Sequence, residues 1–334
     1  MTASRINQGH VDLFDDRFWT SGVFICGHPK SGTSLLMTML DSHPELIVYP
    51  EESHFFRRFR PACGAHPEKN IEEIVREYLL HIFEWNRDDP PGHQEGFADR
   101  DYSSIDSDRV RDLFRESIRQ REGGSEIALP AAMFSYGSAT GQVSDQTKYW
   151  VEKTPYNEQY AEDIFRYWPN SKCLHIVRDP RDNYASYKRK QTDWQPEHFS
   201  YSWWRSLRYG QNNVERFGSA RYLLIRYEDL VEEPEKAINE IILCLGIDDD
   251  PILRRPTRAG RVWMGNSMFG DQFRSISAKP AGRYLEYLNR DEIRTLESLL
   301  RPEMQELGYS LDTAPSYPGY FVSQAKRIKW RLQG

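Results

Sequence analysis

The chain has 334 residues, 39% of them hydrophobic, and a formal net charge of −6. This length can bury the core of one large α/β domain or of two smaller ones, and the negative charge argues against a general nucleic-acid binder. No apolar stretch approaches the roughly 18–20 residues of a membrane-spanning helix, and residues 1–20 lack the apolar core of a signal peptide, so we expect a soluble, cytoplasmic protein without a membrane span.

The first predicted elements are a short strand, a tight turn and a helix. Residues 23–26 form an apolar run typical of a buried strand, and small residues mark a turn over 27–32. From position 35 to position 40 apolar residues recur at helical spacing, so we expect a helix to begin near Ser31. Backbone N–H groups at the start of a helix have no internal partner and lie at the positive end of its dipole. The turn therefore predicts a docking point for an anionic group.

This turn is similar to a P-loop but differs from the nucleotide-triphosphatase form, GxxxxGK[ST]. Gly27 and Gly32 have the required separation, yet Thr33 stands where the lysine belongs, and the lysine is Lys30, inside the loop. A lysine there can reach the outermost group of a bound phosphate anhydride, with the hydroxyl groups of residues 31, 33 and 34 around it. The alternative is a plain strand–turn–helix with an incidental lysine.

Short apolar strands alternate with helical patterns along much of the chain. We predict strands at 22–27, 45–49, 172–177 and 221–226, and helices at 31–42, 70–84, 107–121, 156–167, 180–191, 197–217, 234–245 and 290–307. The last helix has a capping-box start, Asn289 with Glu292 three residues later, and Gly308 suits its end. The alternation predicts an α/β fold, with a mainly parallel central sheet and helices on both faces.

We expect one domain over residues 1–334, with its core at about 20–56 and 150–310 and a C-terminal tail from about 311. The stretch from about 57 to 148 is rich in Asp, Gly, Pro and Ser around two helical patterns and has no strand signal. We interpret it as a helical insertion over the carboxyl edge of the sheet, where ligands bind in open α/β sheets. The alternative is that this stretch has only a structural role.

The four cysteines form no CxxC pair and have no paired Cys/His spacing; they are Cys26, Cys63, Cys173 and Cys244. Three of them lie in apolar segments. We therefore expect reduced thiols in the core rather than disulfides or metal ligands.

A second strand–turn–helix pattern, residues 172–186, also predicts an anion site. Asp179 can cap the helix and Pro180 suits its first position, which puts Arg178 at the end of the strand. Ser186 lies about two turns along the helix, on the side of the turn. A guanidinium and a hydroxyl group that converge from two elements suit a phosphate monoester, since such a charge-assisted hydrogen bond is worth about 1.5–3 kcal/mol. A surface pairing of the arginines and aspartates in 178–182 is the alternative.

The stretch 194–209 is unusually aromatic, with Trp194, Phe199, Tyr201, Trp203, Trp204 and Tyr209. Aromatic residues at helical spacing are more often core than ligand platform, although some can stack on a sugar or aryl acceptor. We assign them no role.

Taken together, the two anion motifs resemble those of the sulfotransferases that use 3′-phosphoadenosine-5′-phosphosulfate (PAPS). Residues 29–34, PKSGTS, are similar to that family's 5′-phosphosulfate loop, and Arg178 through Ser186 are similar to its 3′-phosphate motif, with matching Arg/Ser spacing. The segment RYEDL at 226–230 resembles a further family segment, and 265–267 and 278–284 resemble the C-terminal loop that closes over the cofactor. The segments of this chain that resemble the family cover about 20–56, 150–192, 221–246 and 262–310, and they follow the family's order.

Two details resemble the branch shared by tyrosylprotein, glycosaminoglycan and many bacterial sulfotransferases. Residues 50–56, PEESHFF, are similar to a Glu-x-His-Phe-Phe segment or an acidic pair in those groups. Residues 152–155 read EKTP, so Pro155 stands where cytosolic small-molecule sulfotransferases place a histidine base. A histidine base at that position is therefore excluded.

The resemblance implies in-line transfer of a sulfuryl group from PAPS to an acceptor hydroxyl or amine, with 3′,5′-adenosine bisphosphate (PAP) as product. It places Glu52 at the family's catalytic glutamate, with Glu51 as the nearest rival and His54 as a weaker one. Lys30 and Lys153 should meet the bridging oxygen, and an exposed lysine at a helix start is the alternative for Lys153. The other implied cofactor residues are Ser31, Gly32, Thr33 and Ser34 at the 5′-phosphate, Arg178, Ser186 and Lys279 at the 3′-phosphate, and Tyr227 and Ser267 along the nucleotide.

Tyr227 can equally be a core aromatic residue. No metal is implied, because the fixed cations neutralise the leaving group. The acceptor stays open among sugars, lipids, small alcohols and tyrosine, and so does the oligomeric state. The alternative functions are a P-loop kinase or nucleotide-binding protein, and a catalytically silent sulfotransferase-like binding protein.

Overall fold

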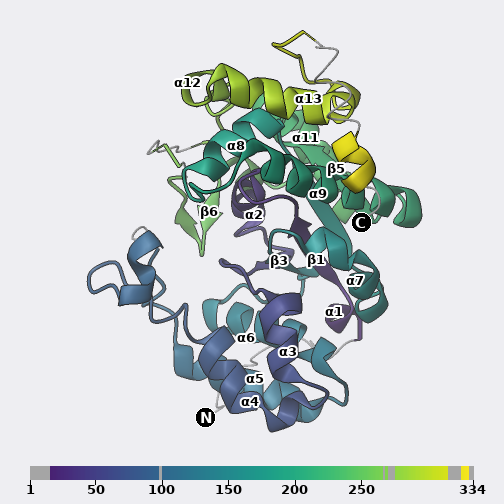
Figure 1. Ribbon diagram of the computed structural model, residues 1–334. Helices are drawn as coiled ribbons and strands as arrows, with labels where there is room; N and C mark the ends of the chain where they lie inside the picture. Colours follow the sequence, from purple (N-terminus) through teal and green to yellow (C-terminus); the bar gives the residue numbers. More distant parts are fainter. Residues whose placement is uncertain (1–15, 98–99, 266–267, 270–274, 315–324, 331–334) are drawn as a thin grey trace, which may run out of the picture. The chain divides into compact units, whose positions relative to one another are not determined.

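The computed structural model describes residues 16–97, 100–265, 268–269, 275–314 and 325–330 (Figure 1). Its five-stranded sheet has the order β2–β3–β1–β4–β5, with β1 at Gly22–Cys26, β2 at Leu46–Val48, β3 at Tyr149–Lys153, β4 at Lys172–Val177 and β5 at Tyr222–Arg226. β2 runs parallel to β3, with Leu46 opposite Tyr149, and β4 runs parallel to β5, with Cys173 opposite Tyr222. A mostly parallel sheet flanked by helices confirms the predicted α/β class.

Contacts within the chain divide it into two compact units. Unit 1 comprises residues 1–23, 42–152 and 164–171, and unit 2 comprises residues 24–41, 153–163 and 172–334. The single domain expected over the whole chain stays a prediction, as does the placement of residues 57–148 over the edge of the sheet.

Unit 1 is largely helical outside its strands. Its helices are α1 (Asp16–Trp19), α3 (Arg60–Cys63), α4 (Ile71–Ile74), α5 (Ser107–Gln120) and α6 (Ala128–Thr140), with π-helices at Phe55–Phe59 and Val75–Leu79 and 3₁₀ helices at Pro67–Lys69, Gly92–Phe97 and Ser125–Ile127. The helix expected at 70–84 is therefore a short α-helix that continues as a π-helix.

Helix α6 was not predicted, because its small residues give no amphipathic period. Residues 128–133 and 135–137 of α6 are all buried, and the helix packs on β2. A Cβ at Gly137 would lie 2.7 Å from the Ile47 side chain, so the glycine permits this close approach.

Unit 2 contains most of the longer helices. They are α2 (Thr33–Leu40), α8 (Pro180–Lys188), α9 (Pro196–Phe217), α10 (Tyr227–Glu232), α11 (Pro234–Leu245), α12 (Tyr284–Tyr287), α13 (Arg290–Glu306) and a final turn of helix at 325–330. The described part of unit 2 also contains two 3₁₀ helices (Asn157–Tyr160 and Pro251–Arg254) and an antiparallel pair, β6 (Thr257–Arg258) with β7 (Arg261–Val262). Helix α7 (Ala161–Tyr167) divides between the two units.

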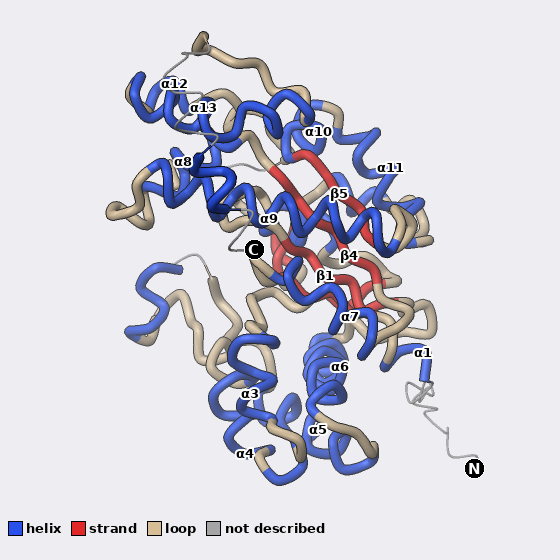
Figure 2. The backbone as a smooth tube through the Cα atoms, turned by 45° about the vertical axis from the view of Figure 1, so that its right-hand side comes forward, coloured by secondary structure: helices blue, strands red, loops and turns tan. Residues whose placement is uncertain are grey.

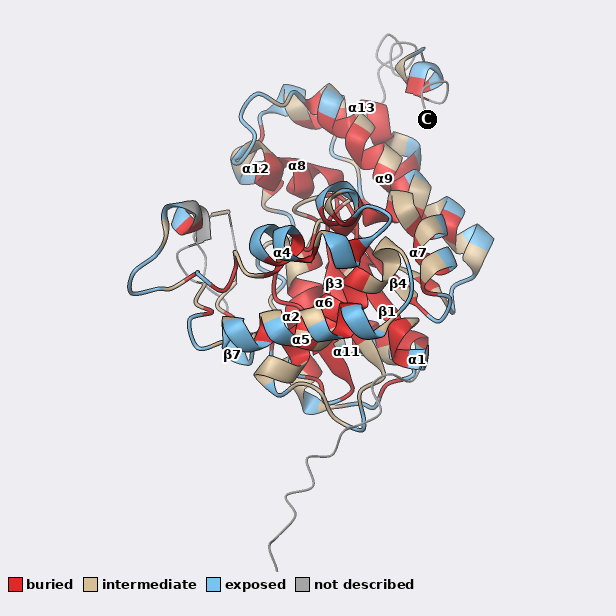
Figure 3. Cartoon of the chain, turned by 90° about the horizontal axis from the view of Figure 1, so that it is seen from below, coloured by how far each residue is buried: buried red, intermediate tan, exposed pale blue. Residues whose placement is uncertain are grey.

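Figure 2 shows α9 crossing β4 and β5, and both α9 and α11 pack on these strands. The contact with α9 is close, because a Cβ at Gly210 would lie 2.7 Å from the His175 ring. Figure 3 shows α8 as mainly buried, and residues of α8, α9 and α13 form one hydrophobic cluster that includes Tyr184, Trp203 and Leu300. Within the aromatic stretch, Phe199 and Trp203 are therefore core residues.

The start of α13 is the predicted capping box: the Asn289 side chain accepts hydrogen bonds at the first turn, and Glu292 accepts one from the Asn289 N–H. All four cysteines are free and buried, as expected. Among the helices described, none has the length and apolar character needed to cross a membrane.

Candidate functional site

The turn between β1 and α2 has a backbone that only certain residues adopt easily. Gly27 and Gly32 have φ of 132° and 108°, and Lys30 has φ of 69°. A Cβ at Gly27 would lie 2.3 Å from the Ile176 carbonyl oxygen, and one at Gly32 would lie 2.5 Å from the Tyr227 ring. Both glycines are therefore required sterically. α2 begins at Thr33, two residues later than predicted, and Gly32 caps it without a side chain.

Buried hydrogen bonds fix this turn from within. The Ser31 hydroxyl, which was expected to face the phosphate, donates to the His28 carbonyl oxygen at 2.6 Å. The Gly27 N–H donates to a carboxylate oxygen of Glu158 at 3.0 Å, and the same carboxylate accepts from the Ser206 hydroxyl of α9. The turn is therefore held in shape before any ligand binds. No sequence pattern indicated that the turn would be fixed by Glu158, His28 and Ser206.

Lys30 is half-buried, and its side chain contacts a weak partner. Its Nζ lies 3.1 Å from the Met268 sulfur, and its carbonyl oxygen accepts from Arg178 at 3.3 Å. A thioether is a much poorer acceptor than an anionic oxygen. An anionic oxygen in the turn would therefore be a stronger acceptor for Lys30 than the Met268 sulfur is.

Arg178 lies at the end of β4, buried at the start of α8. Its guanidinium group donates to the Lys30 carbonyl oxygen, to the Ser186 hydroxyl at 3.5 Å and to the Pro280 carbonyl oxygen at 2.8 Å, and it stacks 4.5 Å above the Tyr227 ring. All three acceptors are neutral, and Nε has no acceptor within the described part of the chain. An orphaned donor on a buried cation fits an anionic ligand.

The alternative of a surface charge pair over 178–182 is wrong. Asp179 and Arg181 do pair, at 2.7 Å, but both are buried, and Asp179 also caps α8 by accepting from the Arg181 N–H, as predicted. The hydrogen bonds of Arg178 are directed to the three neutral acceptors instead.

Asp182 and Asn183 hold two loops against α8, and neither residue was predicted to have this role. The Asp182 carboxylate accepts from the backbone N–H groups of Gly282 at 2.6 Å and of Tyr284 at 2.8 Å, and Asn183 donates to the Pro29 carbonyl oxygen at 3.1 Å. Burial raises the pKa of Asp182, while the charge of Arg178 opposes the shift. These bonds bring the loop that carries Lys279 to Arg178, although the Lys279 side chain is exposed.

Tyr227 is a core residue that also contacts the candidate site. Its ring is buried, contacts Gly32 and stacks on Arg178, and burial raises its pKa. The neighbouring Glu228 accepts from the Asp179 N–H at 2.9 Å. Ser267 lies outside the described residues.

Lys153 ends β3 and is buried, so the alternative of an exposed lysine is wrong. The Thr154 N–H donates to the Ile25 carbonyl oxygen at 3.3 Å, and the Tyr156 N–H donates to the Gly27 carbonyl oxygen at 3.1 Å. Lys153 is therefore the first residue of its segment in unit 2, and it lies beside the end of β1, where the turn begins.

The candidate carboxylate bases lie in unit 1 and differ in their surroundings. Glu51 is buried, accepts from the Tyr102 hydroxyl at 2.6 Å and pairs with Arg100. The Glu52 side chain is 34% exposed and lies 3.6 Å from Nε2 of His54. Glu51 is thus occupied by a hydroxyl and a guanidinium group, whereas Glu52 is accessible.

In unit 2, a glycine-bounded turn at a helix start and a buried guanidinium group lie side by side, joined through the Lys30 carbonyl oxygen. This arrangement, at the ends of strands of an α/β sheet, suits a multiply charged anion of the phosphate type. Among the described residues, no group of three or more His, Cys, Asp or Glu side chains is placed to hold a metal ion.

A family model described as "Sulfotransferase family" matches residues 22–251. The chain therefore belongs to the sulfotransferase family, as the motifs indicated.

The chain is also similar to curated relatives in sequence and to a solved structure in fold. The chain is 25% identical over 248 residues to protein-tyrosine sulfotransferase 2 of Gallus gallus, an alignment that covers 72% of this chain and 55% of that protein. It is 23% identical over 308 residues to protein-tyrosine sulfotransferase A of Caenorhabditis elegans, covering 89% of this chain and 69% of that one. The chain thus spans little more than half the length of the chicken protein. Its fold is similar to that of the sulfotransferase domain from the curacin biosynthetic pathway, with a TM-score of 0.55 and 19% identity over 87% of this chain and 98% of that one.

Proposed function

We propose that this sulfotransferase moves a sulfuryl group from PAPS to an acceptor hydroxyl group, with Glu52 as the general base. The observation that carries the proposal is the buried Arg178, whose orphaned Nε lies beside the turn that holds Lys30. PAPS has anionic groups at both ends of its nucleotide. Two joined anion sites in one unit suit such a ligand better than a single phosphate.

The cofactor assignments follow from these two sites. The turn at 30–34 would hold the 5′-phosphosulfate through its backbone N–H groups, Lys30 and the Thr33 and Ser34 hydroxyl groups. Arg178, Ser186 and the loop of Lys279 would hold the 3′-phosphate, since Arg178 and Ser186 already lie within 3.5 Å of each other. The stacking of Tyr227 on Arg178 would shape the nucleotide site between them.

Lys30 and Lys153 would stabilise the leaving group. During transfer, a bond forms between the acceptor oxygen and sulfur while the bond from sulfur to the bridging phosphate oxygen breaks, and its electron pair stays on PAP. Lysines fixed near that oxygen stabilise the charge as it develops, which is the largest contribution in comparable group transfers. Lys153 is buried, so its ammonium group acts where water screens charge weakly.

Glu52 would take the proton of the acceptor. It is the accessible member of the acidic pair, because Glu51 is bound by Tyr102 and Arg100. The next residue, Ser53, donates to Glu152 at 2.7 Å, and Glu152 directly precedes Lys153 in the chain. This bond fixes the segment that carries Glu52 to the strand that ends at a proposed catalytic lysine.

The names of the curated relatives make tyrosine the first acceptor to test. Both are called protein-tyrosine sulfotransferases, although the chain is at most 25% identical to them. We therefore propose a hydroxyl acceptor, with tyrosine peptides, sugars, lipids and small alcohols as the classes to screen.

Transfer of ³⁵S-labelled sulfate from PAPS to such a library tests the proposal. We expect Lys30→Ala to lower kcat by about 10²–10³-fold, because it removes a charge from the transition state. Glu52→Gln should lower kcat by about 10²–10⁴-fold and leave PAP binding unchanged in calorimetry. The matched controls are Lys236→Ala and Glu240→Gln, both at exposed positions on α11.

Wild-type turnover in both site variants would contradict the assigned roles. Tighter binding of ATP–Mg²⁺ than of PAP would favour the kinase alternative. PAP binding without turnover on any acceptor would favour the silent binding protein.

A further inference from the structure

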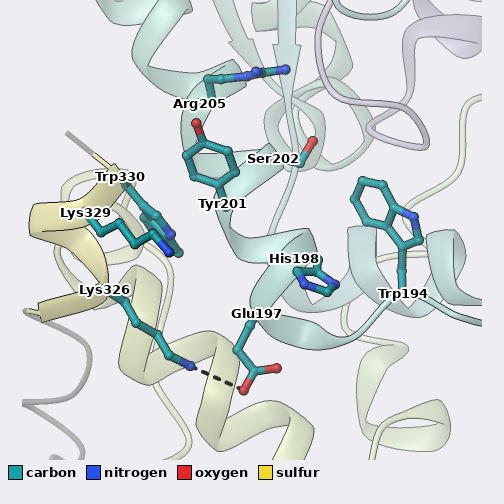
Figure 4. Close-up of a pocket in the computed structure, with 9 residues that line it drawn as sticks. All are labelled: Trp194, Glu197, His198, Tyr201, Ser202, Arg205, Lys326, Lys329 and Trp330. Atoms are coloured by element: carbon teal, nitrogen blue, oxygen red, sulfur yellow. Dashed lines mark hydrogen bonds and ion pairs between the residues drawn. The ribbon is translucent and has the colours of Figure 1, made fainter. Parts of the chain in front are cut away.

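A pocket of about 440 Å³ lies in unit 2, between the N-terminal half of α9 and the final helix at 325–330 (Figure 4). This volume is in the range of small-molecule sites. None of the described residues that line it belongs to the proposed cofactor site. The pocket is therefore a second candidate site, distinct from the proposed cofactor site.

The wall contributed by residues 325–330 is firmly attached. Arg327 is buried and forms a bidentate ion pair with Glu303 of α13, with both N···O distances at 2.6 Å, and it also donates to the Leu299 carbonyl oxygen. Trp330 is buried against Tyr201 and Trp204, at centroid distances of 5.6 and 5.5 Å. A bidentate buried pair and aromatic packing fix this helix to α9 and α13.

The lining combines aromatic rings with positive charge. Trp194, Tyr201 and Trp330 supply the rings, as Figure 4 shows. Arg205, Lys326 and Lys329 supply three cations.

One carboxylate, that of Glu197, occurs among these described lining residues, and it lies 3.5 Å from Lys326. No described carboxylate pairs with Arg205 or Lys329. The pocket therefore carries an excess of positive charge beside its apolar surface.

The position of the pocket on α9 favours an anion further. Glu197 and His198 lie in the first turn of this 22-residue helix, at the positive end of its dipole. Cations from two elements and a helix start thus act on the same space, and the rings give a flat group a surface on which to stack.

We propose that this pocket binds a small aromatic anion, such as an aryl sulfonate, sulfate or carboxylate. The ring would stack between the aromatic side chains, and the anionic group would face Lys326 and Lys329. An uncharged aromatic compound would lack the second contact, and an aromatic cation would be repelled.

Naphthalene-1-sulfonate is a suitable probe, because its carbon-bound sulfonate cannot be transferred and it has no acceptor hydroxyl. Calorimetry and quenching of tryptophan fluorescence should show binding to the wild-type protein, with and without saturating PAP. The double variant Lys326→Gln/Lys329→Gln should raise the Kd by about tenfold, since two favourable charges are lost. Glu197→Gln should lower the Kd by about threefold, because it removes the opposing carboxylate.

The gain expected for Glu197→Gln cannot arise from misfolding, which only weakens binding. Lys236→Gln on α11 is the matched lysine control and should leave the Kd unchanged. Competition by PAP, equal affinity for uncharged 1-naphthylmethanol, equal effects of Lys236→Gln and the double variant, or no binding would each overturn the proposal.

Discussion

His28 occupies the phosphate-type turn as a fully buried, neutral imidazole. Nδ1 lies 3.0 Å from the Pro29 carbonyl oxygen, so it carries the hydrogen, and Nε2 lies 3.2 Å from the Tyr156 hydroxyl, which therefore donates to it. Its ring also contacts Tyr187 and Phe199. Burial lowers the pKa of His28 to about 4, so the turn keeps this tautomer at neutral pH.

This shift predicts acid destabilisation with a definite sign. Between about pH 6.5 and pH 4 the unfolded chain binds a proton at position 28 and the folded chain does not, so stability falls as the pH falls. The loss is about 1.4 kcal/mol per pH unit well inside this window. We expect His28→Gln to flatten the pH dependence of the free energy of unfolding, measured in urea at pH 4.5, 5.5 and 7.

His66→Gln is the control, because the His66 side chain is 62% exposed. His175, which is also buried and has a pKa of about 3, titrates alike in the wild type and in both variants. Equal slopes in wild type and His28→Gln would show that His28 is not held neutral by burial.

At the scale of elements, α8 organises the proposed anion site. Asp179 and Pro180 start the helix, and every residue from Pro180 to Tyr187 is buried. Three of its side chains then act on three neighbours: Asp182 on the loop at 282–284, Asn183 on the turn before Lys30, and Ser186 on Arg178. A short helix thus sets the geometry of both proposed phosphate sites.

We expect Asp182→Asn to weaken PAP binding by about tenfold, as measured by calorimetry. An amide can accept from one of the two N–H groups of the loop, and its own NH₂ group would oppose the other, so one bond of about 1.5–3 kcal/mol is lost. Hydrogen exchange of the amides at 282 and 284 should accelerate in the same variant. The exposed Asp193→Asn is the control, and unchanged exchange at these two amides would refute the role of Asp182.

At the scale of the molecule, a buried charge cluster joins distant parts of unit 2. Arg181 contacts Asp179 at 2.7 Å, Glu297 of α13 at 2.7 Å and Asp312 at 3.3 Å, and it stacks on Tyr284. Glu297 is fully buried and also accepts from the N–H groups of residues 312 and 313. The cluster thus connects the turn before α8 with α13 and the segment that follows it.

Removal of the cation should be costly, because buried carboxylates would lose their partner. We expect Arg181→Met to lower the free energy of unfolding by about 3–5 kcal/mol, measured by chemical denaturation. Arg294→Met, which removes an arginine that is 51% exposed and pairs with Asp291, should cost under about 1 kcal/mol. Similar losses in the two variants would show that the cluster does not stabilise the fold.

Local chemistry explains which elements could be predicted. The apolar run of β4 and the amphipathic α11 begin and end at the predicted residues, and α9 and α13 lie within one residue of their predicted bounds. β3 was missed because Glu152 and Lys153 interrupt its apolar pattern, yet both residues are buried. Only tertiary contacts made these polar residues part of a central strand.

The sequence alone determined the turn that holds Lys30, the capped start of α8 and membership in the sulfotransferase family, because glycine conformations, helix caps and motif spacing are properties of a few neighbouring residues. The tertiary structure decided which groups meet: Arg178 with Pro280, 102 residues away, and Asp182 with Gly282, 100 residues away. The tertiary structure also distinguished the two neighbouring carboxylates, because Glu51 is bound by Tyr102 whereas Glu52 is accessible. Such pairings arise from packing and burial over long loops, and no local pattern encodes them.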